Sequence, residues 1–450
     1  MPQLAMIMPV GPFYAFWIGA AGRPTADVRL IYGRRASVGR MPSDASVRFV
    51  MNMFAKHYRE APLIMPDRFS KREFGFMFFD RDFVMRHLGF PSRAALKKYL
   101  VEQVPAHAYY SCAYYEEPDA PIMVQKKWLG ADLIFDLDAD HVEGAKDLPY
   151  EKMLERVKVE VIRLIDDFLL GDLGFDPEDL KIVFSGGRGY HVHISNPKVL
   201  KLSSHERREI VDYVTGTDLD MDWVFPATLF ETGRWKDRVD IEQRRTMPRL
   251  EDDGWRARIR KGIDALLDEL ESLPHDEGKR RLAQIMAESK RDIGKKTVEG
   301  LYEDLFGGPK GKRGVDRMRS ENTFEVFSEK RHLDAFVDMV EMRVKPKMKG
   351  ETDEPVTSDI KRLIRLPSSL HGKTGFEVVP MTREGLDSFD PFVDAVPEAF
   401  GDREVSLTLD KPAEVRLRGS TFSLDPGVRS VPEYAAVFLI CRRLARLETR

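Results

Sequence analysis

The chain has 450 residues, 42% of them hydrophobic and 32% charged, which is the composition of a globular protein of two or three domains. This excludes a disordered or fibrous protein, and the formal net charge of −3 means that any contact with nucleic acid must come from local basic stretches. The two cysteines, Cys112 and Cys441, can form neither a disulfide framework nor a thiolate zinc site, so we expect a reducing compartment, the cytoplasm.

The N-terminal stretch differs from the rest of the chain. Residues 4–21 are uncharged and apolar, which suggests a signal or membrane segment. Pro9, Gly11 and Pro12 interrupt any helix there, and no basic region precedes it. We therefore interpret residues 1–40 as an extension that is disordered or an artefact of the start site, with translation beginning at Met41 or Met51.

From Asp44 onward the pattern is that of a mixed α/β protein. The predicted elements are, in chain order, a helix around residues 45–59, strands at 74–78 and 133–138, a helix over 151–170, and strands at 181–185 and 190–194. Residues 236–330 are charged, carry apolar residues at helical spacing, and predict a helical insertion into a core formed by 41–235 and 331–450. A last helix is predicted from Pro432.

Two carboxylates end the apolar run at 133–138. Strand alternation places Asp136 and Asp138 on one face and turns Leu133, Phe135 and Leu137 into the core. Two carboxylates about 4 Å apart repel by roughly 4 kcal/mol at an effective dielectric near 20. Such a pair shares a proton or binds a metal ion, and we favour a divalent cation.

A glycine-rich turn joins the strands at 181–185 and 190–194. Its three glycines let backbone N–H groups approach an anion, while Arg188 can fork onto phosphate oxygens and Ser185 and His191 can donate hydrogen bonds. A triphosphate would fit. Alternatively, the segment is only a hairpin turn with a solvent-facing arginine, and the turn by itself favours neither interpretation.

A second cationic set follows near residue 365. Arg365, His371 and Lys373 flank a loop rich in Pro, Ser and Gly that can curl around a ligand. Asp353 or Asp359 could add a third carboxylate to the metal site. We expect Asp359 to lie in the first turn of a helix over 360–365, where it would favour the helix dipole, and Asp353 to lie in an extended stretch.

Basic stretches are the remaining candidates for contact with a phosphate backbone, although charge runs are usually solvated faces. They are Arg256, Arg258, Arg260 and Lys261; Lys310, Lys312 and Arg313; and Arg343, Lys345, Lys347 and Lys349.

The acidic and cationic groups together are the parts needed for two-metal nucleotidyl transfer. The segments LIFDLDADH, FSGGRGYHVHI and VTSDIKRLIRLPSSLHGKTGF resemble the motifs of the catalytic small subunit of the archaeal and eukaryotic replicative DNA primase. The likeness extends to KREFGF, YYSCAYYEEP and VPEYAAVFL, and so runs from about residue 45 to the end.

This resemblance implies a role for each candidate residue. Asp136, Asp138 and Asp353 would be the catalytic carboxylates that bind Mg²⁺ or Mn²⁺. The contacts to the incoming nucleotide would come from Ser185, Arg188, His191, Arg365 and His371. Eukaryotic relatives favour lysine where this chain has Arg365, but arginine keeps the charge and can bind phosphate with two hydrogen bonds.

The resemblance also implies a fold and partners. We expect an α/β (α+β) primase-polymerase core with mixed sheets, one half of it like an RNA-recognition motif, and a heterodimer with a large subunit that holds an iron–sulfur domain. Single-stranded DNA and nucleoside triphosphates would be the substrates, with no membrane partner. Family members often carry a zinc knuckle after the paired aspartates, but residues 139–180 contain no cysteine, so we expect no structural zinc.

Two other functions are considered. A repair-type primase-polymerase would use the same site to fill gaps or join ends. A phosphohydrolase would instead use Asp136 as a nucleophile that forms an aspartyl-phosphate, which would leave the glycine-rich turn without a task.

Overall fold

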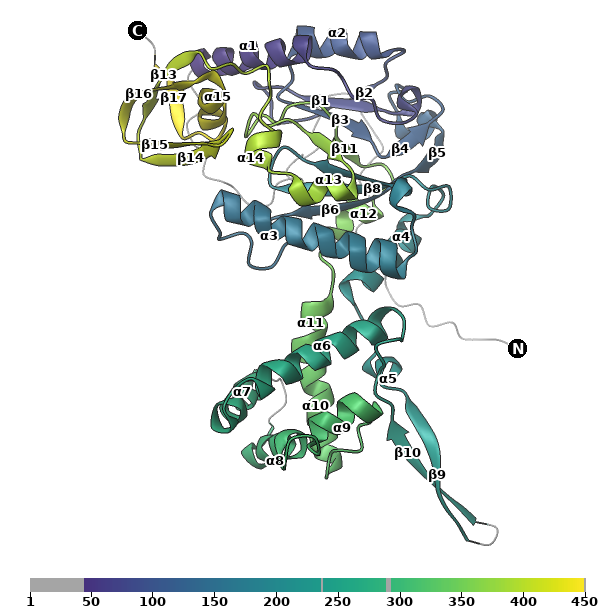
Figure 1. Cartoon of the computed structure of the whole chain (residues 1–450). Helices are drawn as coiled ribbons and strands as arrows, with labels where there is room; N and C mark the ends of the chain where they lie inside the picture. Colours follow the sequence, from purple (N-terminus) through teal and green to yellow (C-terminus); the bar gives the residue numbers. More distant parts are fainter. Residues whose placement is uncertain (1–43, 236–237, 289–292, 449–450) are drawn as a thin grey trace, which may run out of the picture. The chain divides into compact units, whose positions relative to one another are not determined.

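The computed structural model describes residues 44–235, 238–288 and 293–448. The predicted extension over residues 1–40 lies outside the described residues. The α/β class is confirmed, because helices and several antiparallel sheets alternate along the chain (Figure 1). None of the described helices is long and apolar enough to cross a membrane.

The first four-stranded sheet has the order β11-β3-β1-β2. Its strands are β1 (Phe74–Met77), β2 (Met85–Leu88), β3 (His107–Ser111) and β11 (Leu363–Arg365). Helices α1 (Asp44–Glu60) and α2 (Arg93–Gln103) pack against each other. The ring of Tyr99 on α2 lies 4.7 Å from the ring of Phe76 on β1, which places α2 against this sheet. The helix predicted around 45–59 is therefore confirmed as α1.

The second four-stranded sheet, with the order β12-β7-β8-β6, carries the candidate site. Its strands are β6 (Leu133–Asp138), β7 (Leu180–Phe184), β8 (Gly189–Ile194) and β12 (Val379–Met381). Between β6 and β7 the chain forms α3 (Tyr150–Arg163), which packs on β6 and β8 and continues as a π-helical segment, Leu164–Asp172. A four-stranded sheet with a crossing helix agrees with the expected half that resembles an RNA-recognition motif.

The pairing in both sheets is antiparallel. This differs from the mixed sheets that the resemblance implied.

The apolar spacing on α3 explains why this helix packs on the sheet. Leu154, Val157 and Val161 recur every three or four residues and form its buried side.

Buried arginines hold the beginning of β6. Arg72, which lies ahead of β1, donates to the carboxylate of Asp132 at 2.6 Å, and both side chains are 2% exposed. Arg207 of α4 (Ser204–Thr215) donates to the carbonyls of Asp132 and Ala131 at 2.7 and 2.8 Å. Because an unpaired buried charge is costly, these contacts fix where β6 begins relative to β1 and α4.

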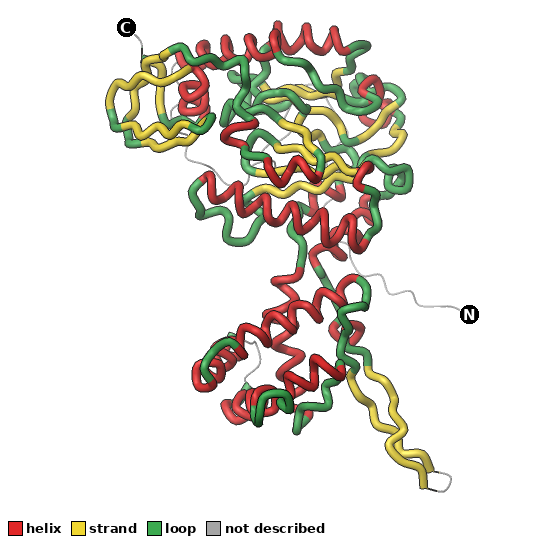
Figure 2. The backbone as a smooth tube through the Cα atoms, viewed as in Figure 1, coloured by secondary structure: helices red, strands yellow, loops and turns green. Residues whose placement is uncertain are grey.

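The region predicted as a helical insertion, 236–330, is helical only in part. Its first described element is the strand β10 (Arg238–Arg245), which pairs with β9 (Ala227–Trp235) and comes before a run of helices, drawn in red in Figure 2. The helices that follow are α6 (Gly254–Glu271), α7 (His275–Ala287), α8 (Lys295–Phe306), α9 (Gly314–Glu321), α10 (Lys330–Met339) and α11 (Lys345–Met348). A short helix, α5 (Met221–Val224), precedes β9. The helical run thus continues past residue 330, and the proposed division into core and insertion stays a prediction.

Several cations of the basic stretches are bound within the protein. Arg258 pairs with Asp172 at 2.8 Å, and Arg260 pairs with Asp264 at 2.9 Å; the two arginine side chains are 10% and 3% exposed. Arg313 pairs with Asp316 at 3.0 Å. These three side chains stabilise the helical region, so they are not available to a phosphate backbone.

The C-terminal part adds small sheets and helices. Its elements are α12 (Glu354–Ser358), α13 (Arg383–Ser388), α14 (Pro391–Asp394), β13 (Glu404–Leu409), β14 (Ala413–Leu417), β15 (Ser420–Leu424), β16 (Gly427–Pro432), α15 (Glu433–Cys441) and β17 (Ala445–Leu447). The strand β13 pairs with β16 and β17, and β14 pairs with β15. The last helix begins one residue after Pro432, as predicted. A further pair, β4 (Ala113–Tyr115) and β5 (Trp128–Ala131), precedes β6.

Candidate active site

The paired carboxylates lie at the end of β6, an edge strand of the second sheet. Phe135 and Leu137 are fully buried, whereas the side chains of Asp136 and Asp138 are 21% and 29% exposed. Successive side chains of a strand point to opposite faces, so Phe135 and Leu137 point into the core and both carboxylates lie on the opposite face. The prediction that Asp136 and Asp138 share a face is confirmed.

Asp353 lies beside Asp136 although the two are far apart in the sequence. Its backbone N–H donates to the carbonyl of Asp136 at 2.9 Å, and α12, which begins at the next residue, packs against β6. Burial raises the pKa of Asp136 to about 7, with further contributions from the charges of Asp138 and Asp353. The three acids therefore lie within electrostatic reach of one another.

The glycine-rich turn meets the carboxylates because β8 pairs with β6. This pairing sets Asp138 opposite Gly189 and Asp136 opposite His191. A Cβ atom at Gly189 would lie 2.0 Å from the carbonyl oxygen of Leu137, so only glycine allows the two strands to approach here.

Arg188 binds two acids of the site. Its guanidinium lies 3.0 Å from Asp138 and donates two hydrogen bonds to Asp140, at 3.0 and 2.5 Å. Ser185, at the beginning of the turn, accepts a hydrogen bond from the N–H of Gly187 at 3.3 Å. The turn is therefore more than a solvent-facing hairpin, since its arginine is directed at the carboxylates.

His191 faces Asp136 across the strand pair, with its Nε2 atom 3.4 Å from a carboxylate oxygen. Burial, followed by the charges of Arg365 and Arg362, lowers the pKa of His191 to about 3. The imidazole is therefore neutral at physiological pH and can donate one hydrogen bond without adding charge.

The second cationic set approaches the same site from β11 and the loop after it. Arg365 lies 2.6 Å from Nδ1 of His107 and stacks over the ring of Tyr109 at 4.6 Å. A Cβ atom at Gly187 would lie 3.0 Å from Nε2 of His371, which places this imidazole against the glycine-rich turn. Burial, followed by the charge of Arg365, lowers the pKa of His371, so its ring is neutral as well.

The predicted helix over residues 360–365 is wrong. Leu363–Arg365 forms β11, which pairs with β3, and the carboxylate of Asp359 accepts a hydrogen bond from the N–H of Lys361 at 2.9 Å. Tertiary pairing with β3 outweighs the local helical preference. Asp353 has an extended backbone, as predicted, and is the cap residue that precedes α12, but its side chain makes no capping hydrogen bond. Its carboxylate can therefore serve the site.

Sequence reasoning missed some neighbours of these residues. His107 of β3 accepts from Arg365, and nothing in its local sequence indicates this contact across the first sheet. Asp140 and His141 directly follow the paired aspartates. His141 lies 3.6 Å from Asp353, and closer attention to the polar residues after Asp138 could have identified both.

Comparison with known proteins identifies the family. Residues 135–383 match the model of the DNA primase small subunit. A DNA primase small subunit PriS of Methanocella arvoryzae is 40% identical over 421 residues, which cover 90% of this chain and all of the relative. The PriS proteins of Methanococcoides burtonii and Methanosarcina barkeri are 40% and 41% identical, with 88% and 89% of this chain and 97% and 96% of the relatives covered.

The chain belongs to the DNA primase small subunit family.

The match includes both paired aspartates, the glycine-rich turn, Asp353, Arg365 and His371. Membership sets aside the phosphohydrolase interpretation, which had no use for the glycine-rich turn. A protein of this family is one subunit of a primase, so membership also implies a large-subunit partner.

The carboxylates of this DNA primase small subunit fit a divalent cation by their chemistry, since Asp136, Asp138 and Asp353 offer the hard oxygen ligands that Mg²⁺ and Mn²⁺ prefer. Within the described ranges, no group of three or more His, Cys, Asp or Glu side chains is arranged so that it could hold a metal ion as it stands. The three acids instead face Arg188, His191 and His141. Burial, followed by the charges of Asp138 and Asp353, raises the pKa of Asp136, so the ionised form of this carboxyl is disfavoured in the metal-free site.

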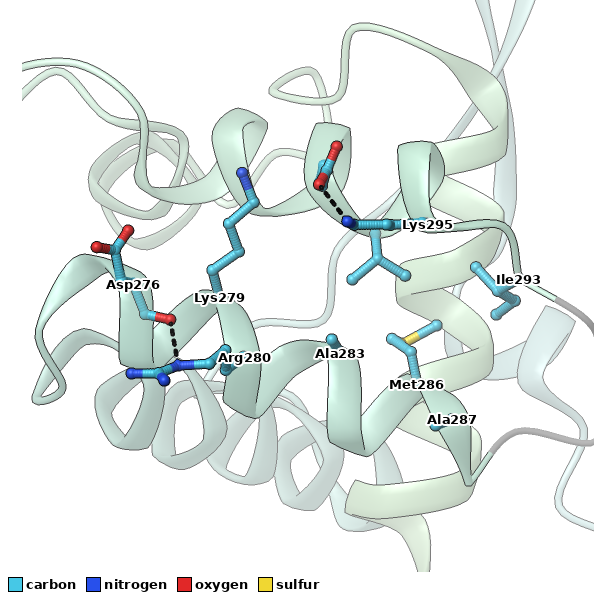
Figure 3. A pocket seen from close by; sticks show the side chains of 10 residues that line it. Asp276, Lys279, Arg280, Ala283, Met286, Ala287, Ile293 and Lys295 are labelled. Atoms are coloured by element: carbon cyan, nitrogen blue, oxygen red, sulfur yellow. Dashed lines mark hydrogen bonds and ion pairs between the residues drawn. The ribbon is translucent and has the colours of Figure 1, made fainter.

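A cavity of about 690 Å³ lies elsewhere, between α7 and α8 (Figure 3). Ala283, Met286 and Val298 form part of its apolar lining. Its charged residues are engaged locally: Lys295 pairs with Glu299 at 4.0 Å, and Arg280 donates to a backbone carbonyl of its own helix. None of the predicted site residues lines this cavity.

Replacing Asp136 by asparagine is expected to stabilise the metal-free protein at high pH. The folded-state pKa of about 7 lies above the ordinary value of 3.8, so the carboxylate costs stability as the pH rises from about 4, and the full cost is present above 7. We expect Asp136→Asn to raise the free energy of unfolding by roughly 1–3 kcal/mol at pH 8 in EDTA, and the gain to shrink towards pH 4.

Urea denaturation at pH 5 and pH 8 measures this effect. Asp140→Asn is the matched control. Partial burial raises the pKa of Asp140, but the hydrogen bonds from Arg188 outweigh this effect and lower the pKa overall. The ionised carboxylate therefore stabilises the fold, and Asp140→Asn should lose stability. An Asp136→Asn protein that is no more stable than the wild type at pH 8 would show that burial and the neighbouring acids do not disfavour the ionised carboxylate.

Proposed function

We propose that this chain is the catalytic subunit of a DNA primase and joins nucleoside triphosphates into short primers on single-stranded DNA by nucleotidyl transfer. The single observation that supports this most directly is the pairing of β6 with β8, which sets the two aspartates against the glycine-rich turn. The family match supports the primase activity, and the arrangement of the acids and the cations supports the reaction type.

Asp136, Asp138 and Asp353 would hold the cations. Mg²⁺ or Mn²⁺, when bound, supplies charge that activates the primer 3′-hydroxyl and neutralises the triphosphate. The backbone bond from Asp353 to Asp136 keeps the third acid in place before any ligand arrives. No structural zinc is part of this proposal.

Arg188 would hold the phosphates. Its guanidinium makes a forked contact with the carboxylate of Asp140, and the same fork matches two oxygens of a phosphate group. The Arg188 side chain is 36% exposed and that of Asp140 is 41% exposed, so the pair is weak enough for a triphosphate to displace the carboxylate.

The neutral groups would orient the nucleotide around this contact. Ser185 and the backbone of the turn would meet an anion without adding charge. His191 and His371 have lowered pKa values because they are buried near Arg365, so each can donate a hydrogen bond while Arg365 supplies positive charge. Because the two histidines are neutral and only Arg365 among these three residues is charged, the site would bind a triphosphate without holding an excess of positive charge when it is free.

The family match supports the choice of a primase large subunit as the partner. The proposed heterodimer joins this chain to a primase large subunit with an iron–sulfur domain, and the proposed template is single-stranded DNA. A primer-synthesis assay on single-stranded DNA, with and without the large subunit, tests the activity. Products made without any pre-existing 3′ end support a primase, whereas extension of supplied ends alone would favour the repair-type alternative.

Neutralising either paired aspartate should abolish nucleotide incorporation. We expect Asp136→Asn and Asp138→Asn each to lower the rate at least roughly 100-fold. Each variant removes a carboxylate ligand of the metal ion that would stabilise the negative charge developing during transfer. Circular dichroism should show an unchanged fold. Asp410→Asn, an exposed acid paired with Arg446 far along the chain, is the control. Full activity in either aspartate variant would remove these residues from the metal site.

Truncating Arg188 should act on nucleotide binding. A hydrogen bond to a charged group contributes about 1.5–3 kcal/mol, so Arg188→Ala should raise the apparent KM for nucleoside triphosphates roughly 10- to 100-fold. Arg188→Lys keeps the charge but loses the fork, and should give an intermediate KM. Steady-state kinetics at fixed template concentration measures both. A KM equal to that of the wild type in Arg188→Ala would exclude this residue from the phosphate site.

A further inference from the structure

Two hydroxyl groups from distant segments bind the carbonyls of the glycine-rich turn. Tyr150, the first residue of α3, donates to the carbonyl of Gly187 at 2.5 Å. Thr374, in the loop after β11, donates to the carbonyl of Gly186 at 2.5 Å. Two successive peptide groups of the turn are thus held by side chains outside it.

The ring of Tyr150 is held by several neighbours. It packs edge-on against Phe392 at 5.6 Å and lies 6.3 Å from Phe438, ring centre to ring centre. The guanidinium of Arg442 stacks over the ring at 4.3 Å. Phe438 and Arg442 come from α15 and the residue that follows it, so the C-terminal helix supports the position of the phenol.

Thr374 is held equally firmly. It is 2% exposed, and its hydroxyl accepts a hydrogen bond from the N–H of Phe376 at 3.2 Å while it donates to Gly186. The hydroxyl also lies 3.3 Å from Nδ1 of His371. Thr374 therefore links the second cationic set to the glycine-rich turn.

The geometry of the peptide bond gives these contacts a consequence. In a trans peptide group, the C=O and the following N–H point in opposite directions. Fixing the carbonyl of Gly186 fixes the direction of the Gly187 N–H, which donates to the hydroxyl oxygen of Ser185 at 3.3 Å. Fixing the carbonyl of Gly187 does the same for the N–H of Arg188. Because glycine backbones are permissive, with φ of +73° at Gly186, the turn would otherwise sample other orientations.

We propose that Tyr150 and Thr374 are positioning residues that hold the backbone of the glycine-rich turn, and with it Arg188, in the orientation that receives the triphosphate. This inference rests on the proposed function, since it assigns a role around the same site. Neither residue touches the reacting atoms. Both act through the backbone of Gly186 and Gly187, and their removal should weaken nucleotide binding more than it slows the chemical step.

The test compares variants that remove single hydroxyls. Tyr150→Phe keeps the ring and its packing, and Thr374→Val keeps the size of the side chain. Each should raise the apparent KM for nucleoside triphosphates about 3- to 10-fold, the effect of one hydrogen bond, while kcat changes less than about twofold. Thr374→Ser retains a hydroxyl and should restore the KM of the wild type.

Tyr213→Phe is the matched control, because Tyr213 donates to Asp172 at 2.9 Å, outside the candidate site. The inference would be overturned if Tyr150→Phe and Thr374→Val both had the same KM as the wild type. An equal rise in KM in Tyr213→Phe would overturn it too, since this would indicate a general loss of packing. If Tyr150→Phe does not fold, the comparison of Thr374→Val with Thr374→Ser tests the inference by itself.

A binding measurement separates this inference from the proposed function. Calorimetric titration of the full chain with ATP and Mg²⁺ needs no primer synthesis. A 3- to 10-fold weaker affinity in Tyr150→Phe supports the positioning role even if the wild type makes no primers, a result that would count against the proposed function only. An unchanged affinity, together with primer synthesis by the wild type, would leave the function standing and remove the positioning role.

Discussion

The pairing of β6 with β8 is the constraint on which the candidate site depends. Its register sets Asp136 opposite His191 and Asp138 opposite Gly189, and so brings the glycine-rich turn to the carboxylates. A shift by one residue would turn the acids to the buried face, which the apolar side chains of Phe135 and Leu137 prevent. The glycine at position 189 allows the close approach that the pairing requires.

Electrostatic balance explains how the free protein tolerates this arrangement. Burial, followed by the charges of Asp138 and Asp353, raises the pKa of Asp136, while Arg188 binds both Asp138 and Asp140. The histidines add hydrogen-bonding capacity without charge, because burial lowers the pKa values of His191 and His371. Under the proposed function, a cation would compensate the carboxylates and a triphosphate would compensate the arginines.

Local sequence signals predicted the parts of the site but not all of their contacts. Alternation at 133–138 and the glycines at 186–189 identified the carboxylates and the turn, because those signals depend on neighbouring residues. The helix expected at 360–365 was wrong, since β11 owes its conformation to β3. His107 and Tyr150 could not be predicted, because their partners lie far along the chain. The basic stretch at 256–261 likewise gave no sign that Arg258 and Arg260 are buried ion-pair partners.

A crystal structure of the chain with a non-hydrolysable nucleoside triphosphate and Mn²⁺ would test the central claim most directly, with anomalous scattering to locate the metal. The account predicts manganese bound by the carboxylates of Asp136 and Asp138, and the guanidinium of Arg188 moved from Asp140 to the phosphates. A nucleotide bound elsewhere, with Arg188 still paired to Asp140 and no manganese at the aspartates, would contradict it.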